Sequence, residues 1–173
     1  FCNTVLASYT GVKRLFSVIT HSPEETARLG MVLGALLRAG DMICLEGDLG
    51  AGKTCFAQGV ARGMGIEGPV SSPTFTLVNE YYGELILYHL DVYRLNSSDE
   101  LEDLGYEEIF YGDGVTLLEW AERVQEALPA ERLEVRIKRQ PDEEAARVIE
   151  ISSRGERYGL LVEELKSIVR SGD

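Results

Sequence analysis

The chain has 173 residues, and its 17 Lys and Arg against 29 Asp and Glu give it a formal charge of −12. This acidic excess argues against a protein that holds DNA or RNA by itself, because phosphate contacts need clustered basic side chains. Three scattered cysteines with no C-x-x-C pair indicate a reducing, cytoplasmic setting and exclude a cysteine-based zinc site. No apolar run approaches the ~18 residues of a membrane-spanning helix, so no membrane association is expected.

Hydrophobic alternation and helical spacing predict that strands and helices follow one another along the whole chain. Strands are expected at residues 15–20, 42–45, 75–82, 85–95, 115–120, 133–138 and 146–152. Helices are expected at residues 22–37, 53–65, 97–110, 121–128 and 160–169. The first helix has a strong start signal, with Ser22 as the cap, Pro23 at the first position and Glu25 completing a capping box. Gly40 lies where a left-handed helix end is expected.

The most informative segment is the glycine-rich run between the second strand and the second helix. Residues 47–54 read Gly-Asp-Leu-Gly-Ala-Gly-Lys-Thr and fit the phosphate-binding pattern G-x-x-x-x-G-K-[ST]. The glycines allow backbone N–H groups to gather around a β-phosphate, and Lys53 adds a cation for the β- and γ-phosphates. The Thr54 hydroxyl is a hard oxygen ligand for Mg²⁺. The alternative interpretation is a glycine-rich turn with a solvated lysine.

The combination of strand–helix units and hairpins with this motif indicates the α/β class. We expect a three-layer P-loop NTPase-like domain with a mixed parallel and antiparallel sheet. Residues 1–20 are interpreted as an N-terminal lead-in, which either originates outside the natural domain or supplies its first strand. Residues 21–173 are expected to form a single P-loop ATPase domain.

Three residues outside the P-loop are candidates for the chemistry of phosphate transfer. Asp91 ends one predicted strand and Glu119 closes another, and a carboxylate at a strand end can hold Mg²⁺ or orient a water. Thr74 lies in a loop where a hydroxyl can sense a γ-phosphate. The alternatives are a capping aspartate, a solvated strand-end glutamate and an ordinary connecting loop.

Other polar and aromatic residues receive simpler interpretations. A histidine without a second one in reach is usually a satisfied interior residue, so His89 is interpreted in that way. Trp120 is expected to fill the core, although it can also pack under a metal site. The Cys55 thiol is near the phosphates, but nothing requires it to be reactive. The acidic stretch 99–108 is expected to be a solvated helix face, with a partner-binding patch as the alternative.

Three further segments, together with the P-loop, carry a family resemblance. Residues 72–78 read Ser-Pro-Thr-Phe-Thr-Leu-Val, residues 89–95 read His-Leu-Asp-Val-Tyr-Arg-Leu, and residues 118–120 read Leu-Glu-Trp. With these motifs in this order, the chain resembles the bacterial TsaE (YjeE) family from about residue 22 to about residue 147. That family is the ATPase component of the machinery that makes threonylcarbamoyladenosine (t6A) at tRNA position 37.

The resemblance implies a role for each matching residue. Residues implied to bind the ATP phosphates are Gly50, Ala51, Gly52, Lys53, Thr54 and Cys55. Thr54 and Glu119 would coordinate Mg²⁺, Asp91 would assist hydrolysis together with Lys53, and Thr74 would belong to a switch-like loop. Pro23 would lie near the adenine. The implied partners are TsaD and TsaB subunits, whose complex would be reset by hydrolysis of ATP to ADP, with weak activity of the chain alone and no strong direct tRNA binding.

Other functions compatible with a P-loop are considered alongside this one. A small-molecule kinase needs an arginine-bearing lid, and the loop at residues 68–80 contains no arginine. A GTPase-like switch needs D-x-x-G and N-K-x-D motifs, and residues 96–99 have the spacing of the second but lack its lysine. A structural subunit that binds nucleotide without turnover is the remaining alternative.

Overall fold

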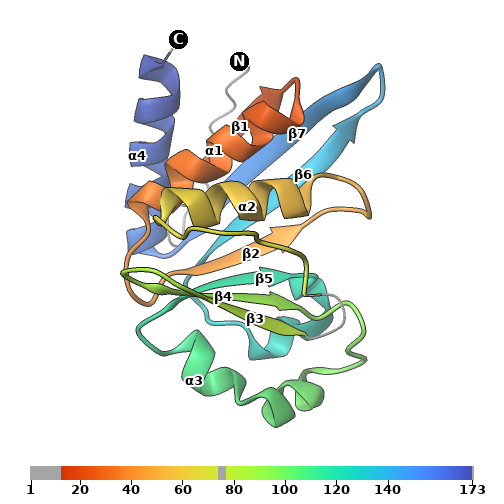
Figure 1. The fold of residues 1–173 in the computed structure, drawn as a ribbon, viewed down its shortest axis with the longest axis vertical. Helices are drawn as coiled ribbons and strands as arrows, with labels where there is room; N and C mark the ends of the chain where they lie inside the picture. The colour runs from red at the N-terminus through yellow and green to blue at the C-terminus, as the bar shows by residue number, and fades with distance from the viewer. Residues whose placement is uncertain (1–12, 74–76, 173) are drawn as a thin grey trace.

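The computed structural model describes residues 13–73 and 77–172, so Thr74 lies outside the described residues (Figure 1). The strands are β1 (Leu15–Thr20), β2 (Met42–Glu46), β3 (Val78–Tyr82), β4 (Ile86–Asp91), β5 (Val115–Glu119), β6 (Arg132–Gln140) and β7 (Glu143–Arg154). The α-helices are α1 (Pro23–Leu36), α2 (Lys53–Gly63), α3 (Tyr106–Phe110) and α4 (Glu156–Ser171), and the 3₁₀ helices are η1 (Ser98–Leu104) and η2 (Ala121–Ala127).

The strands form one 7-stranded sheet in the order β1-β7-β6-β2-β5-β4-β3. The four strands β6, β2, β5 and β4 are mutually parallel, and antiparallel strands extend the sheet on both sides. The predicted α/β class with a mixed sheet is therefore confirmed. Strand β2 is in the middle of the order, so the loop that follows it emerges at the centre of the edge formed by the carboxyl ends of the parallel strands.

Side-chain alternation along β2 divides the core into two layers. Ile43 and Leu45 contact the cluster under α1, α2 and α4, while Met42 and Cys44 contact the cluster under η1, α3 and η2. All four side chains are at most 1% exposed. A strand buried on both faces requires helices on both faces, and this gives the three layers that the sequence predicts (Figure 1).

Several predicted helices differ from the observed ones. The helix expected at 97–110 is divided at Gly105, whose φ of 65° breaks it into η1 and α3. The helix expected at 121–128 is a 3₁₀ segment with a non-helical residue, Val124, inside it. The first helix ends at Leu36, so Gly40, with φ of 86°, belongs to the turn before β2 and not to the helix end. No helix in the described ranges combines the length and apolar character needed to span a bilayer.

Helices α1 and α2 touch through glycines. A Cβ added at Gly30 or Gly34 of α1 would overlap a carbonyl oxygen of α2, at Phe56 and Val60 respectively. In return, a Cβ added at Gly59 of α2 would overlap the carbonyl oxygen of Ala27. The two backbones are therefore in direct contact, and only glycine fits at these crossing points. This contact fixes the axis of α2, and with it the position of the P-loop.

Replacement of Gly34 by Ala is expected to lower the free energy of unfolding by about 2–3 kcal/mol, because the new methyl group forces the two helix backbones apart. Equilibrium urea denaturation measures this change. Gly159→Ala in α4 is the matched control, since its added Cβ comes no closer than 3.6 Å to Arg14. That control should raise stability by about 0.5–1 kcal/mol through helix propensity. Equal effects of the two substitutions would refute the close-contact explanation.

Candidate functional site

The P-loop connects the end of β2 to the first residue of α2. Gly52 is the N-cap residue, with a left-handed φ of 111° and no side-chain cap. The first helical bond runs from the Phe56 N–H to the Gly52 carbonyl at 3.0 Å. The amides of residues 52–55 precede that bond and have no partner within the helix, so they present their hydrogens at the positive end of the helix dipole. This arrangement is suited to an anion such as a phosphate group.

Lys53 extends from the helix start into the loop. Its side chain is buried, with 7% exposure, and the ammonium donates hydrogen bonds to the carbonyls of Gly47 and Asp48. Burial lowers the pKa of Lys53 below its ordinary value, and the nearby Glu119 and Asp91 carboxylates oppose that shift. The alternative of a solvated lysine is therefore wrong, because the ammonium is held inside the loop beside two acids.

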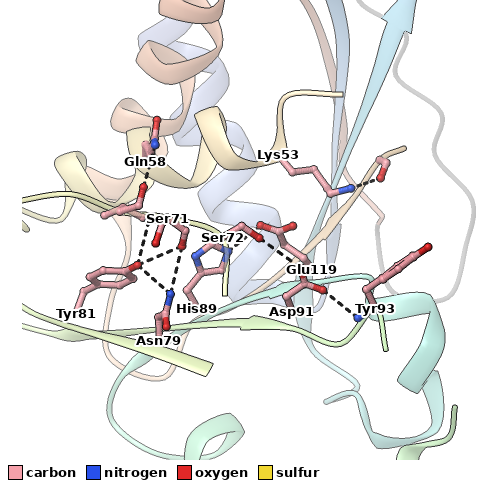
Figure 2. A network of polar contacts seen from close by, with 12 residues as sticks. Lys53, Gln58, Ser71, Ser72, Asn79, Tyr81, His89, Asp91, Tyr93 and Glu119 are labelled. Carbon is pink, nitrogen blue, oxygen red and sulfur yellow. Dashed lines mark hydrogen bonds and ion pairs between the residues drawn. The ribbon is translucent and has the colours of Figure 1, made fainter. Parts of the chain in front are cut away.

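The two candidate carboxylates lie next to each other at the edge of the sheet. Asp91 ends β4, Glu119 ends β5, and the two residues are direct partners in the parallel register. Both are buried, with exposures of 4% and 2%. The interpretation of Glu119 as a solvated strand-end residue is therefore wrong. Figure 2 shows both carboxylates on the side of the sheet from which Lys53 approaches.

Asp91 divides its two oxygens between a turn and a loop. Oδ1 accepts a hydrogen bond from the Tyr93 amide at 2.9 Å, which is the capping role considered for this residue. Oδ2 accepts from the Ser72 hydroxyl at 3.4 Å (Figure 2). Ser72 belongs to the segment before Thr74, and that segment is tied to α2 by a bond of 2.9 Å from Gln58 to the Val70 carbonyl. Asp91 thus has one oxygen that faces the loop.

His89 is a hydrogen-bonded interior residue, as the sequence predicts, and its partner is Glu119, which the sequence did not predict. Its Nε2 donates to Glu119 Oε1 at 2.8 Å, and the imidazole is completely buried. Among the residues that the structure describes, its Nδ1 has no hydrogen-bond partner. The carboxylate is an acceptor, so the proton is placed on Nε2. The sequence signal was the position of His89 two residues before Asp91, on the same face of the strand.

Trp120 belongs to the site as well as to the core. The Lys53 ammonium lies 4.2 Å from the centroid of the indole ring, and the Tyr93 ring packs on it at 4.8 Å between centroids. The backbone of Trp120 is left-handed, with φ of 63°, and this unusual turn after Glu119 directs the ring under the P-loop. Trp120 therefore packs against the core as expected and also contacts the ammonium of the P-loop lysine. A cation over an aromatic face is stabilised by the ring quadrupole.

Pro23 and Cys55 are brought together at the start of the two helices. The Cys55 thiol donates to the Pro23 carbonyl at 2.9 Å, and burial raises the pKa of the Cys55 thiol. A raised pKa disfavours the nucleophilic thiolate, so Cys55 is not an activated cysteine. The contact places Pro23 beside the first turn of α2, and its expected proximity to an adenine stays a prediction.

The oxygen donors at the site fit Mg²⁺ better than a softer metal. Thr54 offers a hydroxyl at the start of α2, and Glu119 offers Oε2, because its other oxygen accepts from His89. Across the described ranges there is no cluster of three His, Cys, Asp or Glu side chains that could hold a metal alone. Mg²⁺ commonly takes one or two protein oxygens and completes its shell with phosphates and waters. The donor set is consistent with that pattern.

Two arginines that sequence reasoning did not select also contact the P-loop. Arg147 of β7 donates to the carbonyls of Ala51 and Gly50 at 2.7 and 3.5 Å, and Arg139 of β6 donates to Gly50 at 3.2 Å. They come from the hairpin formed by the last two strands. No sequence motif marks them, because their relation to the loop depends on strand pairing between residues almost 100 positions apart.

Comparisons with known proteins agree with this geometry. A family model described as "Threonylcarbamoyl adenosine biosynthesis protein TsaE" matches residues 20–149. The chain is 52% identical over 147 residues to the tRNA threonylcarbamoyladenosine biosynthesis protein TsaE of Bacillus subtilis, covering 84% of this chain and 90% of that protein. It is 50% identical over 111 residues to the protein of the same name from Treponema pallidum, covering 64% and 82%. Among solved structures, it is similar to Bacillus subtilis YdiB, with a TM-score of 0.80, 43% identity, and 91% and 98% coverage.

Replacement of His89 by Leu is expected to lower the free energy of unfolding by about 2–3 kcal/mol, because the buried Glu119 carboxylate loses its donor. Thermal or urea denaturation at neutral pH measures the change. His21→Leu is the matched control, since its imidazole is 57% exposed and pairs with Glu143 at the surface. The control should change stability by less than about 0.5 kcal/mol. A similar small effect at His89 would contradict the importance of this pair.

Proposed function

The chain belongs to the TsaE family, and from this premise we propose that it is the ATPase subunit of tRNA t6A synthesis. In this proposal it hydrolyses ATP with Mg²⁺ in the cytoplasm and thereby resets a complex of TsaD- and TsaB-type subunits. The observation that carries the proposal is the convergence of P-loop amides and Lys53 with two buried strand-end carboxylates. A site with donors on one side and acids on the other can hold a triphosphate and a water together.

The phosphates would be bound by the backbone of residues 50–55. Support comes from the N-terminus of α2, which has no side-chain cap and therefore leaves its first amides available to an anion. Lys53 would transfer its hydrogen bonds from the loop carbonyls to the β- and γ-phosphates. Its ammonium would then neutralise the charge that develops during cleavage, and because Lys53 is only 7% exposed, its charge is little screened by water.

Thr54 and Glu119 would hold the Mg²⁺, and the bound ion would neutralise negative charge on the phosphate oxygens. His89 fixes one oxygen of Glu119, so the remaining oxygen has a defined direction. Asp91 Oδ2, the oxygen that faces the Ser72 loop, would orient the attacking water and accept its proton. Thr74 would sense the γ-phosphate from that same loop.

Partner binding is proposed to use the acidic surface. The acids of residues 99–108 are exposed, which agrees with the expected solvated face. They lie on η1 and α3, in the layer opposite α1 and α2 (Figure 1). With a net charge of −12, the chain would be attracted to a basic surface on its partner. Such a protein can serve tRNA modification through a complex without binding tRNA strongly by itself.

Lys53→Ala and Glu119→Ala are each expected to lower ATP turnover of the complex with TsaD- and TsaB-type subunits by about 100-fold or more. Release of inorganic phosphate measures this turnover. Lys138→Ala is the control, because the Lys138 ammonium pairs with Glu150 on the sheet. Full activity of the Lys53 variant would refute the assigned roles. Transfer of phosphate to a metabolite would instead favour a kinase, and tighter binding of GTP than of ATP would favour a GTPase-like switch.

The association rate with the partner complex is expected to fall about tenfold or more between roughly 0.05 M and 0.5 M NaCl, because salt screens attraction between acidic and basic surfaces. Stopped-flow fluorescence measures this rate. A double variant with Glu107→Gln and Glu108→Gln should reduce the salt dependence, since it removes two exposed acids of α3. An association rate that does not respond to salt would remove the steering role of the acidic surface.

A further inference from the structure

The basic side chains of the β6–β7 hairpin fall into two groups according to their partners. Four of them pair with glutamates at 2.7–3.2 Å, and these are Arg132, Arg136, Lys138 and Arg154. The remaining two, Arg139 and Arg147, form no ion pair with any residue that the structure describes. What distinguishes these two arginines is the position of their acceptors in the loop between β2 and α2. Both lie against the P-loop and donate to backbone carbonyls instead.

Arg147 binds backbone at four points. Its Nε and Nη2 donate to the carbonyls of Ala51 and Gly50 at 2.7 and 3.5 Å. Its Nη1 donates to the carbonyls of Glu144 and Ala146 in its own hairpin, at 2.6 and 2.9 Å. The planar guanidinium thus joins the hairpin to the loop. A fixed fork of donors can bind several carbonyls at once, which a lysine ammonium cannot do with the same geometry.

Arg139 supports the same segment from the neighbouring strand. It is the direct cross-strand partner of Arg147, and its Nη2 donates to Gly50 at 3.2 Å. Two arginines in direct register repel each other, so their pairing needs compensation. The carbonyls of the P-loop, each a partial negative charge, provide acceptors for both.

Because a peptide bond is planar, the hydrogen bonds that hold the loop carbonyls also orient the amides of the phosphate site. The Ala51 carbonyl and the Gly52 N–H belong to one rigid plane and point in opposite directions. A guanidinium that holds the carbonyl therefore fixes the direction of the amide, which is the first donor at the start of α2. Gly50 and Gly52 both have positive φ, at 74° and 111°, and glycine backbone is otherwise free to turn.

We propose that Arg147, assisted by Arg139, is a positioning residue that holds the P-loop in its phosphate-binding conformation. Nucleotide affinity therefore depends on the β6–β7 hairpin, which contributes no residue to the P-loop motif. The choice of ligand rests on the proposed function, while the contact between hairpin and loop does not.

Calorimetry with ADP tests the effect on binding. Arg147→Ala should weaken ADP binding by about 10- to 100-fold, because charged hydrogen bonds that orient the loop are lost. Arg147→Lys should stay at least about fivefold weaker than the unmodified chain, since a point charge does not replace the planar fork. Arg154→Ala, on the same strand but paired with Glu134, is the control and should stay within about twofold.

Hydrogen exchange of the nucleotide-free chain tests the positioning itself. Arg147→Ala should accelerate exchange of the Ala51 and Phe56 amides, which donate to the Asp48 and Gly52 carbonyls in the folded loop. The amides of β2 and β7 should be unchanged, which also verifies that the variant folds. Unchanged exchange of the P-loop, unchanged ADP affinity, or full recovery with Arg147→Lys would each overturn the proposal. Failure of the unmodified chain to bind ADP or ATP would instead refute the proposed function, and the exchange measurement would still decide whether Arg147 orders the loop.

Discussion

The contact between the backbones of α1 and α2 determines where the phosphate site can be. Because Gly30, Gly34 and Gly59 have no side chains, the two helices approach until carbonyl oxygens meet α-carbons. The start of α2 is therefore fixed relative to α1 and to the sheet. The P-loop has to connect that fixed point to the end of β2, so its path is constrained by helix packing that begins at Phe56, in the first turn of α2. The direction of the first amides of α2 and the position of Lys53 follow from this geometry.

Electrostatics explains how so acidic a chain can be suited to a polyphosphate. The positive groups near the loop are the helix terminus, Lys53, Arg139 and Arg147. Lys53 is balanced by two buried acids and an aromatic ring, so its charge is tolerated despite burial. The arginines have backbone partners only, and their charge is not neutralised within the described chain. Several positive groups thus lie at the P-loop, although the chain as a whole carries a net charge of −12.

The sequence predicted what depends on local patterns. The strands around the P-loop follow from apolar runs, and the motif itself places the helix start, because both signals involve neighbouring residues. The capping of α1 by Ser22 is confirmed by a hydrogen bond of 3.2 Å to the Glu25 amide. Glu25 accepts from the His21 amide, one residue earlier than a capping box requires. Such one-residue differences depend on the exact path of the chain, which residue types alone do not define.

The sequence did not predict contacts that depend on the register of distant strands. His89 becomes a partner of Glu119 only because β4 and β5 are parallel and adjacent, and Trp120 reaches Lys53 only through a left-handed turn. The helix predicted after Trp120 is a 3₁₀ segment, since a hydrophobic pattern of a few residues does not distinguish the two types. The interpretations of His89 and Trp120 as core residues agree with their burial and packing, but their contacts with Glu119 and Lys53 were not predicted.

Strand direction explains why so many separate segments meet at one edge. Strands β6, β2, β5 and β4 run in the same direction, so their carboxyl ends deliver Arg139, the P-loop, Glu119 and Asp91 to one side. Strand β7 is antiparallel to β6 and begins at that side of the sheet, so Arg147, near the start of β7, also lies there.

Strand β1 is antiparallel to β7 and ends there with Thr20 opposite Arg147, so α1 also starts at this edge. A hydrogen bond of 2.7 Å between Thr20 and Thr26 ties the strand end to the helix. Binding at the carboxyl edge is general for open α/β sheets. In this chain β7 and β1 extend that edge beyond β6, so elements outside the four adjacent parallel strands also contribute to the site.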